Sequence, residues 1–336
     1  MQADDLAHCR DAIRTGSRSF HAASKLLPRR VRDPALALYA FCRLADDAVD
    51  EGTDKAGAVL TLGERLDRVY RGQPRNAPAD RAFAAVVETH QMPRALPEAL
   101  LEGLAWDADG FRPTTFSDVL SYSARVASAV GAMMAVLMGV RDASRLARAC
   151  DLGLAMQLTN IARDVGEDAR AGRLYLPAEW LEQAGIDAAA FLADPRPTPP
   201  VLAMVARLLA EAETLYLRSE PGIAALPLDC RPSIYAARHV YAAIGHDLSR
   251  HGCDSITRRA HTSGRTKLRL MGWAGLRSAA ALLAPLPATL HAPPAPEVAF
   301  LVEAATRRLC VQARSDRLIE VLGQLRARDL AARQRG

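Results

Sequence analysis

Helix-forming patterns follow one another along almost the whole chain, and no stretch shows sustained alternation of β-branched and polar residues. Ala, Leu and Arg dominate, and aromatic residues make up only 5% of the sequence, a composition that favours helix. Asp33 and Ser117 are candidate helix N-caps. Breaks are predicted where Pro and Gly gather, near residues 26–34, 71–80, 110–118, 192–200, 219–232 and 284–296. The sequence therefore predicts an all-α protein.

We expect one all-α domain over residues 1–285, followed by a Pro-rich linker and a C-terminal helical extension over residues 286–336. No run of eighteen or more uncharged apolar residues interrupts this pattern. The nearest candidate, Leu268–Leu290, is broken by Arg269, Arg277 and prolines. This segment is apolar enough to rest on a membrane surface but is not expected to span one.

The overall charge and the cysteines indicate the compartment. The net charge is +5 and the pI is near 9.0, which suits an anionic substrate or an anionic membrane surface. Six cysteines are scattered without a metal-binding spacing, as is typical of reduced thiols. Residues 1–16 are too polar for a signal peptide. We therefore expect a cytoplasmic protein.

Three aspartates and a glutamate interrupt an apolar run in Phe41–Gly52, FCRLADDAVDEG. Like charges one helical turn apart repel by a few tenths of a kcal/mol unless they are solvated or bind a cation. By itself, such a stretch is more often a solvent-exposed acidic face, or an Arg–Asp pair within the helix, than a metal site. On a helix, steps of three and four residues place one stripe of side chains together: Tyr39, Arg43, Asp46 or Asp47, and Asp50.

A second polar stripe lies in the apolar segment Leu152–Pro177. Two helices that each present carboxylates four residues apart can face each other across a bundle and hold cations between them. Gly131 and Gly153 would let neighbouring helices approach closely. Arg173 follows in a loop that Gly172 opens over the helix end. The stripe itself steps by four, three, four and four residues through Gly153, Gln157, Asn160, Asp164 and Asp168.

The ligand types indicate the cation and the reaction. Carboxylates and a carboxamide without nearby His or Cys favour Mg²⁺ or Mn²⁺ over zinc. Such metals make it possible for carboxylates to face a diphosphate, and Arg43 and Arg173 would add contacts to the phosphate oxygens. This equipment suits the ionisation of an allylic diphosphate, whose carbocation needs a dry cavity.

Two further segments fit such a cavity without proving it. Tyr122–Val140 has an apolar stripe of small or flexible residues, which is more often ordinary core than a groove for an isoprenoid tail. Gly16–Phe20, GSRSF, supplies two hydroxyls, an arginine and an aromatic ring, and is uninformative alone.

Together, these segments resemble the squalene/phytoene synthase family of head-to-head condensing enzymes over residues 10–280. The second stripe, with Arg163-Asp164 and Arg173, matches the family spacing closely, and Tyr122–Gly131 and Ser17–Phe20 fall in the expected order. The resemblance implies an all-α isoprenoid-synthase fold, a helical bundle around a central cavity.

The resemblance also implies roles for individual residues. Asp47 is a further candidate metal ligand, because Val49 stands where the family often has an acidic residue. The metal-binding carboxylates would be Asp46, Asp50, Asp164 and Asp168, with Asn160 and Gln157 lining the second metal face. The diphosphate contacts would come from Ser17, Arg18, Arg43 and Arg173. The aromatic side chains beside the cation path would be Phe20, Tyr39 and Tyr122.

Within the family, the segments are similar to those of bacterial carotenoid pathways. This implies that two geranylgeranyl diphosphates condense through prephytoene diphosphate to phytoene, with Mg²⁺ or Mn²⁺ and without NADPH. A dehydrosqualene- or squalene-type synthase acting on farnesyl diphosphate and a non-catalytic scaffold of the same fold are the alternatives. The lipid substrate and product imply peripheral contact with the inner membrane and neighbouring pathway enzymes as partners; no nucleic-acid partner is expected.

Overall fold

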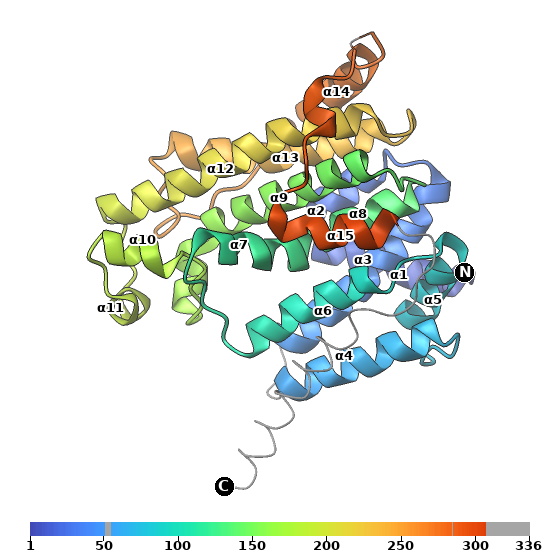
Figure 1. Cartoon of the computed structure of the whole chain (residues 1–336), viewed down its shortest axis with the longest axis horizontal. Coiled ribbons are helices and arrows are strands. Elements are labelled where there is room, and N and C mark those ends of the chain that lie inside the picture. The colour runs from blue at the N-terminus through green and yellow to red at the C-terminus, as the bar shows by residue number, and fades with distance from the viewer. Residues whose placement is uncertain (51–54, 284, 307–336) are drawn as a thin grey trace, which may run out of the picture.

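The computed structural model of the chain describes residues 1–50, 55–283 and 285–306, without the side chains of residues 18, 46 and 48–50. Every regular element in these residues is a helix, so the predicted all-α class is confirmed (Figure 1). The elements are α1 (Ala3–Gly16), α2 (Arg18–Ser24), α3 (Arg29–Asp50), α4 (Lys55–Tyr70), α5 (Pro78–His90), α6 (Ala95–Ala108), α7 (Phe116–Ser123), η1 (Ala124–Ser128), α8 (Ala129–Leu137), α9 (Ala143–Arg170), α10 (Ala178–Gln183), α11 (Ala188–Ala193), α12 (Pro199–Ala224), α13 (Arg231–Arg250), α14 (Gly264–Ala280), η2 (Ala288–His291), η3 (Pro296–Val298) and α15 (Ala299–Thr306).

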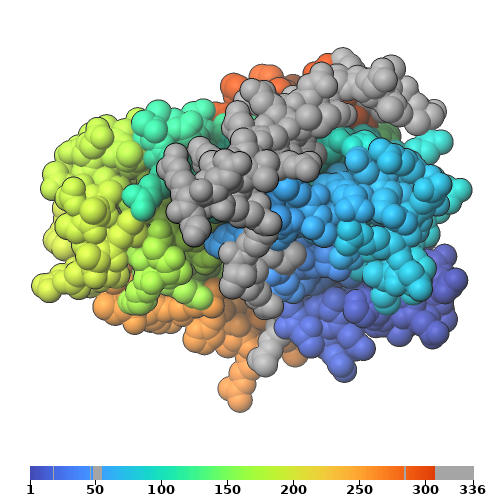
Figure 2. Space-filling view, turned by 90° about the horizontal axis from the view of Figure 1, so that it is seen from below, coloured from blue at the N-terminus to red at the C-terminus, as the bar shows by residue number. Residues whose placement is uncertain are grey.

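Helix α9 is the central element of the bundle. It has 28 residues and packs against α12, α13, α8 and α15. The Asp142 carboxylate accepts a hydrogen bond from the backbone N–H of Arg145 at 3.0 Å and so caps its first turn. In Figure 1, α12 and α13 lie on one side of α9, and α3, α6 and α4 lie on the other. Seen from below, α10 and α11 form one end of the molecule, and α4 and α5 form the other (Figure 2).

Two clusters of buried apolar side chains meet along α9. The first includes Phe41 of α3, Leu154 of α9 and Leu301 of α15. The second includes Leu158 of α9 and Leu208 of α12. Because α9 contributes to both clusters, its polar stripe is held by packing on each side. Four cysteines are buried free thiols, as the sequence predicts, while Cys310 lies outside the described residues; the four are Cys9, Cys150, Cys230 and Cys253.

The segment Phe116–Leu137 runs as α7, η1 and α8, in which η1 is one turn of π-helix. By length and hydropathy alone it is the one described segment that could cross a membrane, but 61% of its most apolar window is buried inside the bundle. It packs against α6 and α9. We therefore regard it as a core helix.

Both predicted N-caps are wrong. The hydroxyl of Thr115, not of Ser117, accepts the hydrogen bond from the backbone N–H of Asp118, and the Asp118 carboxylate accepts one from the backbone N–H of Thr115. The Ser117 hydroxyl instead donates to Glu297 at 2.7 Å. Asp33 is not a cap because α3 already begins at Arg29.

Candidate active site

The predicted polar stripe of α9 is present as one half-buried face of a single helix. The side-chain amide of Asn160, one turn before Asp164, donates to the side-chain Oε1 of Gln157 at 3.3 Å. Gly153 lies against η1, and a Cβ at this position would stand 2.5 Å from the Ser128 Cα. Gly153 therefore permits the close helix approach that the sequence predicts.

Two arginines converge on Asp164. Arg163 donates from Nε to Oδ1 at 2.8 Å, and Arg259 donates to the same oxygen at 2.9 Å. Arg259 also pairs with Glu167 at 3.0 Å. Burial by itself raises the pKa of Asp164, but the hydrogen bonds and charges of the two arginines outweigh burial, so its pKa lies below the ordinary carboxyl value. Asp164 is thus held as a carboxylate.

Asp168 is less well compensated. Its one ion pair among the described residues is with Arg173, whose Nη2 lies 3.2 Å from Oδ1. Gly172 at φ +76° turns the chain back, so that the backbone N–H of Arg173 donates to the carbonyl of Asp168 at 2.8 Å. Burial, together with the charge of Asp164, raises the pKa of Asp168 to about 6 in spite of Arg173. An added cation would favour its ionised form.

Helix α3 brings Tyr39 and Arg43 to the end of α1. A Cβ on Gly16 would meet the Tyr39 hydroxyl at 2.4 Å and the Arg43 Cδ at 3.5 Å. Arg43 pairs with Asp47 within the helix, at 3.0 Å from Nε to Oδ2. This intrahelical pair, one of the alternatives for the acidic stretch, is present. The side chains of Arg18, Asp46 and Asp50 lie outside the described residues.

The segment at the start of α2 has a local structural role. The Ser17 hydroxyl caps α2 by accepting a hydrogen bond from the backbone N–H of Phe20 at 3.2 Å. The Phe20 ring packs against Tyr241 of α13 at 5.3 Å between centroids. Burial raises the pKa of Tyr241 to about 12; the charge of Arg163 opposes this shift and that of Asp164 adds to it. These contacts bring the Ser17–Phe20 segment toward the carboxylate face of α9.

Asp107 of α6 fixes two tyrosines, the buried Tyr122 and the half-buried Tyr175. The hydroxyl of Tyr122 donates to Oδ2 at 2.7 Å, and that of Tyr175 donates to Oδ1 at 2.8 Å. Burial, then the charge of Asp107, raises the pKa of Tyr122 well above its usual value, so this phenol stays neutral. Four rings stack in sequence at 5.1–5.3 Å between centroids and form what we call the aromatic wall: Trp106, Phe111, Tyr122 and Tyr175.

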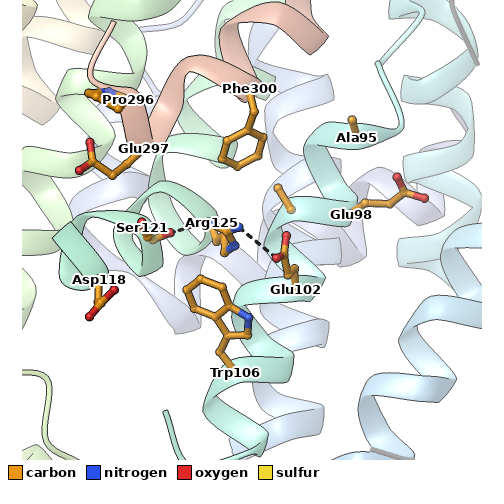
Figure 3. Close-up of a pocket in the computed structure, with 11 residues that line it drawn as sticks. Ala95, Glu98, Glu102, Trp106, Asp118, Ser121, Arg125, Pro296, Glu297 and Phe300 are labelled. Carbon is orange, nitrogen blue, oxygen red and sulfur yellow. Dashed lines mark hydrogen bonds and ion pairs between the residues drawn. The ribbon is translucent and has the colours of Figure 1, made fainter. Parts of the chain in front are cut away.

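A cavity of about 360 Å³, which Trp106 of the aromatic wall helps to line, lies between α6, the α7–η1 segment and residues 296–300 (Figure 3). The guanidinium of Arg125 lies over Trp106 at 4.2 Å and over Phe300 at 5.3 Å. It donates to Glu102 and to the backbone carbonyl of Ser121, both at 3.0 Å. Helix α6 therefore presents Asp107 to the tyrosines and Trp106 to the buried Arg125.

Sequence reasoning missed Asp107, Arg259 and Tyr241. Arg259 lies far from α9 in sequence, and the signal available was only a basic loop, SITRRAHTSGR, that has no acidic residue. Asp107 could not be distinguished in the sequence from an ordinary polar residue near a helix end. Its partners, Tyr122 and Tyr175, come from two other segments of the chain.

The donor set fits the predicted divalent cation. Oxygen atoms from Asp164, Asp168 and Asn160 line one face of α9, and magnesium prefers such ligands. Among the described residues, no three His, Cys, Asp or Glu side chains come together as a complete metal site. The guanidinium groups of Arg163, Arg259 and Arg173 now supply the positive charge that faces these carboxylates.

Fold and site together define the all-α isoprenoid-synthase class. The chain belongs to the squalene/phytoene synthase family, whose model matches residues 13–269. It is 62% identical to a phytoene synthase of Cereibacter sphaeroides, over 97% of this chain and 94% of the relative, and 60% identical to one of Rhodobacter capsulatus, over 97% of each. A dehydrosqualene synthase crystallised with a ligand superposes with a TM-score of 0.75 at 31% identity, covering 82% of this chain and 97% of that one.

Proposed function

We propose that the chain is a phytoene synthase that condenses two geranylgeranyl diphosphates head to head. The observation that carries this proposal is the pair Asp164 and Asp168 on one face of α9, with arginines from three segments around it. The near-full-length identity to two phytoene synthases supports the same product. The reaction releases two diphosphates and needs no reductant, so NADPH is not proposed as a cofactor.

The carboxylate face would hold the metal–diphosphate group. Bound Mg²⁺ or Mn²⁺ would neutralise charge on the leaving diphosphate. Asp164, Asp168 and Asn160 are the proposed metal ligands on α9, and Asp46, Asp50 and Asp47 are those on α3. The arginines around α9 would turn from the carboxylates to phosphate oxygens when substrate arrives, because Arg binds both groups in the same bidentate way.

The aromatic wall would shape the path of the carbocation. Tyr122 is 5% exposed and neutral, so it offers a ring face and a tethered hydroxyl but no phenolate that could capture the cation. Its hydroxyl is committed to Asp107, which fixes the ring plane against Phe111 and Tyr175. Phe20 and Tyr39 are proposed to line the opposite side of the path.

The product assay tests this function. The purified protein is incubated with Mg²⁺ and either geranylgeranyl or farnesyl diphosphate, with no NADPH. We expect phytoene from geranylgeranyl diphosphate and a much lower rate with farnesyl diphosphate. Formation of dehydrosqualene alone, or of squalene only after NADPH is added, would favour the farnesyl-specific alternative. No turnover with either substrate would favour the non-catalytic scaffold.

We also propose a cytoplasmic location with peripheral attachment to the inner membrane, near other carotenoid-pathway enzymes. The proposal rests on chemistry: both the prenyl tails of the substrate and the hydrocarbon product partition into lipid. Fractionation of cells that express the chain, with a salt wash of the membranes, tests it. Recovery only in the soluble fraction at low salt would contradict it.

A further inference from the structure

The exposed apolar side chains of the described residues are concentrated in one short segment. Six of the nine large ones lie between residues 268 and 286. Leu268 is 73% exposed, Leu276 is 64% exposed and Leu283 is 92% exposed. Monomeric proteins seldom gather exposed apolar groups in this way unless the surface binds something.

These side chains share one face of α14 and the turn after it. Leu268, Gly272, Leu276 and Ala279 follow at steps of four, four and three residues, and all are exposed. The opposite face, with the buried Ala274, packs on α13. The end of α14 and the turn that follows project beyond the rest of the bundle, at the top of Figure 1. This face is therefore free to meet an extended flat surface.

The same segment is strongly cationic. Between Asp254 and Glu297 the sequence has six Lys and Arg and no Asp or Glu. Arg277 is paired with Glu220, as Arg258 and Arg259 are with acidic residues of the bundle. Arg265 and Arg269 are exposed and form no ion pair with a described residue.

We propose that α14 and the turn at residues 281–283 dock the protein on an anionic lipid bilayer; this rests on the proposed function only in giving that docking a purpose. Leu268, Trp273 and Leu276 would enter the boundary between headgroups and acyl chains, where Trp is favoured. Arg265 and Arg269 would lie at the headgroup phosphates. A two-fold contact with a second copy fits this face less well, because it would bring these like charges together.

The docking helix is connected directly to the carboxylate face. Gly264, where α14 begins, follows Arg259 by five residues, which span at most about 18 Å. Arg259 contacts Asp164, and the backbone N–H of Gly166 donates to the carbonyl of Ser255 in the same segment. The start of the docking helix is thus tethered to the segment that contacts Asp164.

Vesicle binding of the full chain tests the docking surface. The probes are vesicles of phosphatidylcholine with phosphatidylglycerol and vesicles of phosphatidylcholine alone. We expect binding to the anionic vesicles that weakens with salt and shifts the Trp273 emission to shorter wavelength, a shift absent in Trp273→Phe. Removing both charges in Arg265→Gln/Arg269→Gln should weaken binding about 30-fold, or about fivefold for each arginine.

Matched leucines supply the control. Leu268→Asn/Leu276→Asn should lose vesicle binding, whereas Leu217→Asn/Leu228→Asn should keep it. Leu217 and Leu228 are similarly exposed, at 59% and 58%, but lie outside α14: Leu217 is in α12 and Leu228 is in the loop before α13. Equal binding by both pairs, or no binding by the wild type, would overturn the proposal. So would a concentration-dependent dimer in solution that the first pair abolishes.

The two proposals fail separately. With substrate dissolved in detergent micelles, Leu268→Asn/Leu276→Asn should turn over at the wild-type rate, and with substrate in anionic vesicles it should be slow. If the wild-type protein binds vesicles but makes no phytoene, the proposed function is contradicted and the proposed docking surface is still supported.

Discussion

At the scale of single residues, the charges of the site converge on Asp164. Asp164→Asn keeps the side-chain volume but removes the charge that faces Arg163 and Arg259 and the proposed metal. We expect turnover to fall by about 10³-fold, as when one preorganised charge contact is lost from an active site. Glu167→Gln, one turn away and also paired with Arg259, is the matched control and should lose less than about tenfold. Near-normal turnover of Asp164→Asn at limiting Mg²⁺ would show that this carboxylate is not a ligand.

Asp107 acts through the tyrosines that it holds. Asp107→Asn loses the charge in two hydrogen bonds, each of about 1.5–3 kcal/mol. We expect a fall of about tenfold or more in turnover, and Asp107→Asn/Tyr122→Phe should be little worse than either single change, because the two residues act as one unit. Tyr70→Phe, whose hydroxyl donates to the carbonyl of Met92 at 3.1 Å, is the control and should keep its activity. Additive losses would separate the roles of Asp107 and Tyr122.

His239 of α13 predicts a pH dependence of stability. Burial, then the charge of Arg238, lowers the pKa of His239 from 6.5 to about 4, while Glu220 opposes and Arg277 assists this shift. The unfolded chain therefore binds a proton before the folded one does. The contribution to stability is fully present above pH 6.5 and is lost as the pH falls through about 4. Urea unfolding at pH 7 and pH 4.5 should show a smaller loss for His239→Gln than for the wild type; equal losses would contradict the assignment.

At the scale of elements, the packing of α9 on η1 depends on one glycine. In Gly153→Ala the new Cβ would stand 2.5 Å from the Ser128 Cα, which is backbone and cannot turn aside. We expect a loss of about 1–3 kcal/mol in the free energy of unfolding, with lower activity because Gln157 and Asn160 shift with the helix. Gly272→Ala on α14 is the control: nothing lies within 4 Å of its Cβ, so it should stabilise the helix by about 1 kcal/mol. Chemical denaturation measures the free energy of unfolding of both variants. Equal changes in the two variants would show that the steric contact with Ser128 is not the cause of the loss.

Helical periodicity predicts the all-α class and the stripe of α9, because Gln157, Asn160, Asp164 and Asp168 belong to one helix and local spacing determines their face. It did not predict partners that come from distant segments, such as Arg259 at Asp164 or Asp107 at Tyr122. The helix ends also depended on context. The start of α7 is set by a reciprocal pair of hydrogen bonds between Thr115 and Asp118, which single-residue cap preference did not distinguish from a cap at Ser117.

At the scale of the whole molecule, the family match ends at residue 269, but the hydrophobic core continues beyond it. Residues 288–306 lie across α8 and α9, where Val298 and Leu301 are fully buried. Arg148, itself paired with Asp151, donates to the carbonyl oxygens of Thr289 and Ala292 at 2.5 and 3.1 Å. The described part of the C-terminal segment therefore shares the core of the main bundle.

This shared core predicts how the protein unfolds. Leu301→Ala removes a fully buried side chain and should cost about 2–5 kcal/mol, whereas Leu217→Ala, at a 59% exposed position, should change stability by less than about 0.5 kcal/mol. If residues 288–306 belong to the same cooperative unit, Leu301→Ala moves the single unfolding transition monitored by Trp180 fluorescence, although Trp180 lies in the other core cluster. A second, earlier transition that leaves the Trp180 signal unchanged would show that the C-terminal segment unfolds on its own. Cooperative unfolding would mean that sequence beyond the family match stabilises the helix that carries the proposed metal ligands.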